Sequence, residues 1–360
     1  MSLLLLQSVF LPIILAPLVY YVGLKMGKNV GWLAFVIMLY STGLVLYSGM
    51  DNNGSLFTNT RLETYSWNPI GEFGLHLDGL SFPFAAIIMI LSTTLAVYSM
   101  PYMEHRVREE FHENKKKFSV DALNRKMALY YSLYVIYAAG MLGTVLATNL
   151  IQFYIFFELM LIPSFFLISE FGYGERAKIS VMYFLWKHVG AVSLLAGILT
   201  VGYFGGSFNF VEIAESGLPN SIRIWVAIAI SFGLLMKLAA AGLHVWLPYA
   251  HAESPTPISA LLSPAMIGIG AYALFRLIVE FLPQTYADLS IWITIWGVGT
   301  MFYGGAMALM QDDIKRVFAY SSISQMGYLL FGIGSISTLG LAGAEMMYVS
   351  HALGKGLLFM

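Results

Sequence analysis

A lysine near the middle of a long apolar stretch constrains this chain more than any other sequence feature. The stretch reads IWVAIAISFGLLMKLAAAGLHVWLP and contains Lys237. About 24 such residues cross a hydrocarbon core of roughly 30 Å as one helix, with Lys237 near its centre. A lysine at that depth costs roughly 2.5 to 3.5 kcal/mol on insertion scales, so it indicates a function. Gly242 and Pro248 predict that this helix is broken within the membrane, as in helices that line a watery cavity.

Composition places the chain among integral membrane proteins, because 58% of its 360 residues are apolar and only 11% are charged. The net charge of -1 gives no footprint for binding nucleic acid. Cysteine is absent, which excludes disulfides, iron-sulfur clusters and thiolate zinc sites within this polypeptide. We therefore expect no cofactor in this chain, and any redox chemistry must take place in partner subunits. The apolar N-terminal segment has no basic region before it and no clear cleavage site, so we interpret it as a retained span.

Apolar windows predict an all-α, polytopic bundle of eleven transmembrane spans. Their expected ranges are 3–23, 29–50, 79–102, 127–148, 150–170, 178–204, 223–248, 256–281, 288–310, 313–335 and 338–360. With the N-terminus outside, 13 basic residues fall in inner loops and 3 fall on the outer side. This asymmetry predicts a multi-pass protein of the plasma membrane with its N-terminus outside. The segment 104–126 is expected to be a solvated cytoplasmic loop, and the segment 51–78 is expected to cap the outer face.

Three lysines remain inside apolar spans, namely Lys187, Lys237 and Lys355, and the fifth span carries Glu158. A pair between Glu158 and Lys237 at ~4 Å would be worth about 4 kcal/mol at an effective dielectric near 20. Making and breaking such a pair would switch the proton affinity of both groups, which is what a proton relay requires. A single buried ion pair can also be purely structural. Several such groups in separate spans are harder to explain that way, because a scaffold needs none of them.

Other polar groups in the spans extend this candidate pathway. His188 follows Lys187 directly, and because neighbours on a helix point ~100° apart, only one of the two can face a given partner squarely. His351 and Lys355 are four residues apart and share a helix face. The tenth span carries a polar stripe of Ser321, Ser324, Gln325 and Tyr328, which can hold waters between spans or simply bond to its own helix. Glu345 is expected at the interface.

A metal site is disfavoured. His244 and His251 lie near Glu253, but the segment lacks a third close histidine or a helical HExxH arrangement. We therefore assign no metal ligands and keep His244 among the candidate pathway residues.

The chain resembles the antiporter-like subunits of respiratory complex I, of Mrp-type sodium/proton antiporters and of energy-converting membrane hydrogenases. The resemblance runs from Asp78 onward and includes Glu158, Lys237, His351 and Lys355. The stretches that carry it are LHLDGLS (75–81), FFELMLIPSFFLI (156–168), LLMKLAAAGLHVWLPYAHAESPTPISALL (234–262), AYALFRL (271–277), QDDIKRVFAYSSISQMGYL (311–329) and SHALGKGLLF (350–359).

The resemblance implies that Glu158 of span five pairs with Lys237 of span seven and that protons or sodium ions cross along a hydrated central axis. His351 and Lys355 match positions where relatives carry ionisable groups, and Gln325 falls where some carry histidine. It also implies inverted five-helix repeats with a broken span seven. We accordingly expect an N-terminal part at 1–126, a first repeat at 127–281 and the start of a second, incomplete repeat at 288–360.

The chain departs from the family pattern at one central position. Where many relatives have a lysine or histidine in span eight, this chain has Gly268. The link across the centre is then left to water, to Lys187 or to His188, or is absent.

The expected function is that of a proton- or sodium-translocating subunit of a multisubunit membrane complex, together with other membrane subunits that include further antiporter-like ones. We expect no redox catalytic site in this chain and a coupling to a redox arm in its partners. One alternative is a subunit of an Mrp-type cation/proton antiporter. A stand-alone secondary solute carrier, with Lys237 binding an anionic substrate, would show uptake by the chain alone. An inert scaffold would tolerate neutralisation of its buried charges.

Overall fold

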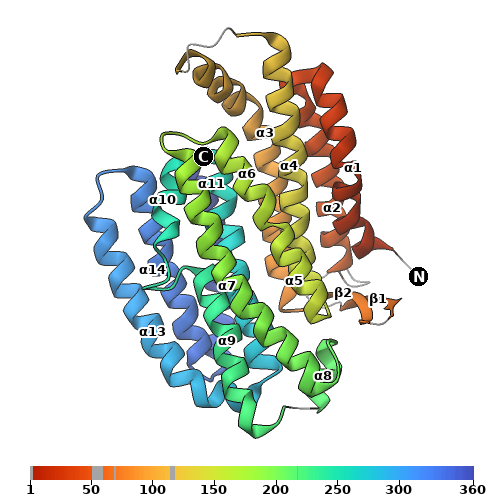
Figure 1. Ribbon diagram of the computed structural model, residues 1–360, viewed down its shortest axis with the longest axis vertical. Coiled ribbons are helices and arrows are strands. Elements are labelled where there is room, and N and C mark those ends of the chain that lie inside the picture. The colour runs from red at the N-terminus through yellow and green to blue at the C-terminus, as the bar shows by residue number, and fades with distance from the viewer. Residues whose placement is uncertain (1–2, 51–59, 69, 114–117, 217) are drawn as a thin grey trace.

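The computed structural model describes residues 3–50, 60–68, 70–113, 118–216 and 218–360. Long helices lie side by side along the longest axis of the molecule (Figure 1). Among the described residues, eight helical stretches are long and apolar enough to cross a membrane. The predicted all-α, multi-pass fold is confirmed. Each of the eleven expected ranges contains helix, and the number of spans stays a prediction.

The first part of the chain packs α1 and α2 against α3 and α4, at the right of the view in Figure 1. Pro12 and Pro17 lie inside α1 without ending it. A short 3-10 turn, η1, joins the first two helices because Gly27 takes a left-handed φ of 55° there. The bounds are α1 Leu4–Met26, η1 Gly27–Asn29, α2 Val30–Ser48, α3 Ser81–Glu113 and α4 Val120–Leu146.

A β-hairpin between α2 and α3 was not predicted from the sequence. Its strands, β1 Arg61–Trp67 and β2 Gly71–Leu77, pair antiparallel with Arg61 opposite Leu77. It lies at the same end of the molecule as the short helix α8, Phe210–Ser216, and the end of α3 and the start of α4 lie at the opposite end (Figure 1). We call these the hairpin end and the loop end. Residues 51–59 of the expected cap lie outside the described part.

The expected cytoplasmic loop is mostly helix, because α3 continues to Glu113. Arg106 is only 3% exposed and donates to the backbone carbonyls of Phe171 (3.3 Å) and Gly172 (2.6 Å). The carbonyls at the end of a helix lack partners within it, so a guanidinium there satisfies them and complements the helix dipole. The segment is therefore helix up to Glu113 where a loop was predicted, and Arg106 on it is buried. The charged side chains of Arg108, Glu109 and Glu113 are exposed, as predicted. Residues 114–117 are not among those described.

Two predicted spans are each divided into two helices. Pro163 has no N–H for the carbonyl of Leu159, and the fifth span divides there into α5 Leu150–Leu159 and α6 Leu161–Phe171. The seventh span divides into α9 Asn220–Leu238 and α10 Trp246–Glu253, as expected. The break begins at Ala239 (φ 61°) and includes Gly242 (φ 88°). Pro248 lies in the first turn of α10, where a missing N–H leaves no bond unmade.

The eighth span forms the interior of the second part, and its apolar window is entirely buried. It alternates between α-helix and π-helix, with bounds α11 Thr256–Leu261, η2 Leu262–Met266, α12 Ile267–Leu274 and η3 Phe275–Glu280. Such π-helical turns are rare and are frequently found at functional sites. Around it lie α7 Arg176–Gly205, α13 Pro283–Leu309, α14 Ile314–Gly334 and α15 Thr338–Phe359.

Helices α7 and α9 approach closely at two glycines. A Cβ on Gly233 would come within 2.4 Å of the carbonyl oxygen of Gly190, so neither position accepts a larger side chain without movement. Lys187 lies about one turn from Gly190, and Lys237 lies about one turn from Gly233. The close crossing therefore brings the two lysine-bearing segments together.

Candidate functional site

Lys237 occupies the last turn of α9, directly before the break. Its side chain is 2% exposed, and its ammonium group lies 4.2 Å from the centre of the Phe157 ring. Its Nζ has no hydrogen-bond partner among the described residues. An aromatic face stabilises a cation without neutralising it, at roughly 2 kcal/mol or more in a desolvated setting. The predicted buried lysine is thus present, with an aromatic ring in place of the expected carboxylate beside it.

Glu158 does not form the predicted direct pair with Lys237 in this structure. Its Oε2 lies 3.6 Å from Nδ1 of His188, and its Oε1 is buried without a partner among the described residues. The reason is local, because Phe157 lies against the Lys237 ammonium and Glu158 points to α7 instead. Glu158 remains within electrostatic range of Lys237. The carboxylate therefore has two basic neighbours on different helices, and of these two it contacts His188.

Lys187 is buried in a cage of apolar and aromatic groups. It is 3% exposed, and its Nζ lies 3.8 Å from the centre of the Trp246 ring and 5.2 Å from that of Tyr183. Its nearest polar contact is the sulfur of Met266 in η2, at 3.6 Å. Lys187 and Lys237 are within electrostatic range of each other. Span six therefore places a second lysine at the centre of the molecule, where its side chain contacts span eight.

His251 is a candidate that sequence reasoning missed, since it entered there only as a disfavoured metal ligand. It is fully buried in α10 and stacks on Phe359, and neither ring nitrogen has a hydrogen-bond partner among the described residues. Lys187, His351 and Lys355 all act on it electrostatically. No group of three or more metal-binding side chains occurs in the described part of the chain. His251 was missed because a polar loop was expected after the break in span seven. In the structure this segment is α10, which folds back into the protein interior.

His351 and Lys355 share one face of α15, as predicted, and both are almost fully buried. Lys355 donates to Ser321 Oγ at 2.8 Å and to the Phe318 carbonyl at 3.1 Å. His351 bonds to the backbone of Ser263, within π-helix η2, and its Nε2 has no partner among the described residues. Ser321, the first residue of the predicted polar stripe on α14, is therefore a hydrogen-bond partner of Lys355.

The remaining predicted residues are His244 and Gln325. His244 sits inside the break of span seven, where it accepts from the Gly242 N–H and meets the Tyr303 hydroxyl at 3.1 Å. Gln325 is half-buried on α14. A Cβ on Gly268 would lie 2.0 Å from the Tyr348 ring, so an aromatic side chain fills the space where relatives are expected to carry a basic one.

Six ionisable side chains from five helical segments therefore form one buried set, which we call the central chain. The segments are α5, α7, α9, α10 and α15, and each member is within electrostatic range of another. The set holds one carboxylate and five bases, so its members cannot all be charged together at acceptable cost. Its members are Glu158, Lys187, Lys237, His251, His351 and Lys355.

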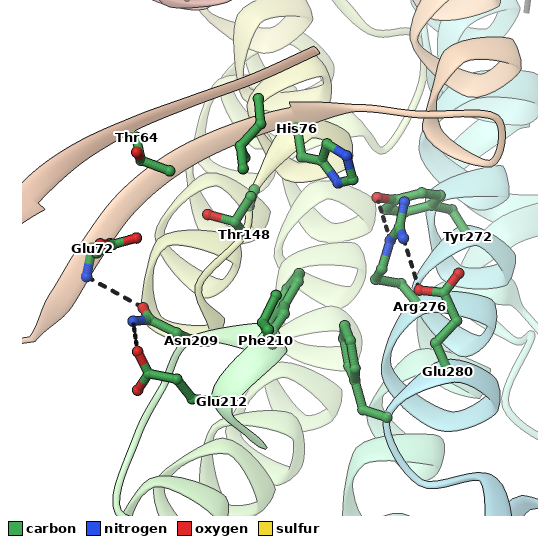
Figure 2. A pocket seen from close by; sticks show the side chains of 14 residues that line it. Thr64, Glu72, His76, Thr148, Asn209, Phe210, Glu212, Tyr272, Arg276 and Glu280 are labelled. Carbon is green, nitrogen blue, oxygen red and sulfur yellow. Dashed lines mark hydrogen bonds and ion pairs between the residues drawn. The ribbon is translucent and has the colours of Figure 1, made fainter. Parts of the chain in front are cut away.

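A second polar cluster lies at the hairpin end, on a cavity of about 490 Å³ (Figure 2). Arg276 of η3 binds both carboxylate oxygens of Asp78 at 2.8 Å and also contacts Glu280 (2.7 Å) and the Tyr272 hydroxyl (3.2 Å). It thereby joins the hairpin motif LHLDGLS to the span-eight motif AYALFRL. Sequence reasoning matched both motifs to the family but did not foresee that they meet.

The charges of this cluster fix the protonation of Asp78. Burial acts to raise the pKa of its carboxyl group, but the Arg276 guanidinium and hydrogen bonds from Ser81 outweigh burial and hold the pKa below its ordinary value. Burial lowers the pKa of the neighbouring His76, and Asp78 opposes that shift only in part. Asp78 is therefore a fixed negative charge between the hairpin and span eight.

Known protein families and individual proteins match this chain over most of its length. Residues 147–360 match the family described as NADH:quinone oxidoreductase/Mrp antiporter, TM. Residues 67–112 match the N-terminus of NADH-ubiquinone oxidoreductase (complex I), chain 5. NAD(P)H-quinone oxidoreductase chain 4-2 of Synechocystis sp. is 30% identical over 97% of this chain and 60% of its own length. F(420)H(2) dehydrogenase subunit M of Methanosarcina mazei is 31% identical over 97% of this chain and 69% of its own length.

In respiratory complex I from Thermus thermophilus with bound NADH, one subunit has the same fold, with a TM-score of 0.82. The identity is 22%, and the match covers 99% of this chain and 70% of that one. The chain thus spans about three fifths of the length of the Synechocystis relative.

The fold and the central chain define a multi-pass membrane protein with ionisable groups at its core. The chain belongs to the NADH:quinone oxidoreductase/Mrp antiporter family, as the residues that carry the resemblance predicted.

Proposed function

We propose that this chain is a proton- or sodium-translocating subunit of a multisubunit membrane complex. The observation that carries the proposal is the Lys237 ammonium, which is buried without a counter-ion and lies within electrostatic range of Glu158. An inert scaffold gains nothing from such a group, whereas a carrier needs a charge whose partner can change.

In this mechanism Glu158 pairs in turn with two bases, His188 and Lys237. While Glu158 contacts His188, Lys237 lacks a close anion and gives up its proton readily. When the carboxylate turns to Lys237, the pair holds that proton, at about 4 kcal/mol for a ~4 Å contact at an effective dielectric near 20. The released proton passes by way of Lys187 and His251 to Lys355 and His351. Waters between these groups complete the contacts that the side chains do not make directly.

The driving energy comes from redox chemistry in a partner arm. The names of the Synechocystis and Methanosarcina relatives, an NAD(P)H-quinone oxidoreductase chain and an F(420)H(2) dehydrogenase subunit, support this choice over a stand-alone carrier. Flavin and iron-sulfur clusters belong to those partners. The complex lies in the plasma membrane, with the hairpin end and the N-terminus outside.

The test uses the full chain in its native complex, purified and reconstituted into liposomes. The partner subunits are identified by mass spectrometry, and ion uptake is followed during turnover of the complex. Glu158→Gln keeps the shape of the side chain but removes its charge, and we expect ion uptake to fall at least about tenfold, as for loss of a positioned proton carrier. Unchanged uptake by a fully assembled Glu158→Gln complex would overturn the proposal.

A further inference from the structure

The face of α15 that carries His351 and Lys355 continues toward the hairpin end as a polar stripe. Glu345, Tyr348, His351 and Lys355 follow one another at intervals of three, three and four residues. Such spacing keeps them on one side of a helix over about 15 Å of its length. Glu345 was expected at the interface and has no part in the function proposed above.

Each group between Lys355 and the hairpin end has an unused polar atom. Among the described residues, Glu345 Oε1, Tyr348 Oη and His351 Nε2 are buried without a hydrogen-bond partner. Unpaired buried polar atoms destabilise a fold, so three along one helix face point to a common use. Waters that enter the stripe would satisfy all three and join them into one line.

The packing around Tyr348 holds the middle of this stripe in place. Its ring stacks on Phe84 with centroids 3.9 Å apart and fills the space beside Gly268. Along α15, Tyr348 lies about one turn from both Glu345 and His351, and the stacking holds its ring in place.

Glu345 links the stripe to the cluster at the hairpin end. It lines a cavity of about 810 Å³ with Gly79, Phe82 and Pro83 at the start of α3, next to Asp78. Asp78 acts on Glu345 electrostatically and is itself held by Arg276. The Glu345 carboxylate therefore lies between the buried stripe and a fixed negative charge near the surface of the hairpin end.

We propose that protons leave or reach the central chain along α15 and that Glu345 is the terminal proton carrier on the hairpin side. This inference rests on the function proposed above and selects the proton as the transported ion. An imidazole, a phenol and a carboxylate pass protons, whereas a sodium ion needs several oxygen ligands around one point. In each step one N–H or O–H bond breaks and another forms. Tyr348 accepts a proton and releases its own, and no electrons move.

The test compares variants in the complex reconstituted into liposomes, with proton uptake followed by a pH-sensitive dye. Glu345→Gln should lower proton translocation at least about tenfold, because a positioned proton carrier contributes that much or more. Glu345→Asp keeps an ionisable group and should restore most of the rate. Tyr348→Phe keeps the stacked ring and loses only the hydroxyl, so it should also be slower than the wild type. Asp288→Asn is the control, since Asp288 is an exposed carboxylate, 59% accessible, on α13.

The outcomes separate this inference from the proposed function. Wild-type proton uptake by Glu345→Gln, together with loss of uptake in Lys237→Ala, would overturn the route along α15 and leave the proposed function standing. Wild-type uptake by both variants would overturn both. Normal proton uptake by Glu345→Gln with loss of radioactive sodium uptake would overturn the choice of ion.

Discussion

The ammonium group of Lys237 rests on the ring of Phe157, one residue before the carboxylate expected to neutralise it. The distance to the ring centre is 4.2 Å, and Glu158 contacts His188 instead. The aromatic face favours the cation without fixing its proton, and the adjacent carboxylate can change the balance by a small movement. A permanent ion pair would hold the charge in place and would not serve a carrier.

This contact predicts the effect of Phe157→Leu. The substitution removes the ring beneath Lys237, and a cation–π contribution of about 2 kcal/mol in this desolvated setting corresponds to a roughly thirtyfold slower ion translocation. Phe166→Leu is the matched control, because it removes the same volume from an exposed position on α6, and among the described rings only Phe157 is paired with Lys237. Equal rates for the two variants in reconstituted liposomes would contradict a role for the ring.

The bidentate contact between Asp78 and Arg276 predicts a loss of stability in Asp78→Asn. The amide keeps the shape of the side chain and removes the charge that Arg276 binds at 2.8 Å through both oxygens. We expect the free energy of unfolding at neutral pH to fall by about 1.5 to 3 kcal/mol, as for a charge-assisted hydrogen bond. Thermal unfolding of the purified complex measures the effect, and Asp288→Asn, whose partner Arg223 lies 3.7 Å away at the surface, should change little.

The same contact gives a pH dependence of known sign. The pKa of Asp78 is held below its ordinary value of 3.8, mainly because Arg276 outweighs the effect of burial. Its stabilising contribution is therefore present in full above that value and is lost as the pH falls through the lower pKa of the folded state. The difference in unfolding temperature between the wild type and Asp78→Asn should persist down to about pH 4 and shrink below it. A difference that disappears between pH 7 and pH 5 would contradict this assignment.

The orientation in the membrane can be measured by cysteine labelling, because the chain has no cysteine of its own. Leu62 in β1 is 59% exposed, and Val120 at the loop end is 64% exposed. In intact cells, a membrane-impermeant maleimide should label the Leu62→Cys chain at once and the Val120→Cys chain only after permeabilisation. The reverse pattern would place the N-terminus inside.

Hydropathy and charge asymmetry were sufficient to predict the helical ranges, because lipid allows only helices and closed barrels to span it. The break in span seven followed from Gly242, although its start at Ala239 did not, because alanine rarely adopts a left-handed conformation. The hairpin went unrecognised because its two strands lie among polar residues that resemble a loop. Arg106 looked solvated because its carbonyl partners belong to a helix end distant in sequence.

For the candidate site, sequence supplied Glu158, both central lysines and the pair on α15, since an ionisable residue within an apolar run is visible directly. It could not supply His251, which lies beside a loop in sequence and becomes buried only because α10 folds back into the core. It also predicted a Glu158–Lys237 contact that the structure replaces with His188 and Phe157. Which neighbour a side chain selects depends on helix rotation, and spacing along the chain does not determine that.

Ion translocation by Lys237→Ala in the reconstituted complex tests the central claim most directly. Lys178→Ala, which removes a lysine that is 77% exposed at the loop end, serves as the control. The account predicts that Lys237→Ala assembles normally and translocates ions at least about tenfold more slowly than Lys178→Ala. An assembled Lys237→Ala complex that moves ions at the rate of the control would contradict it.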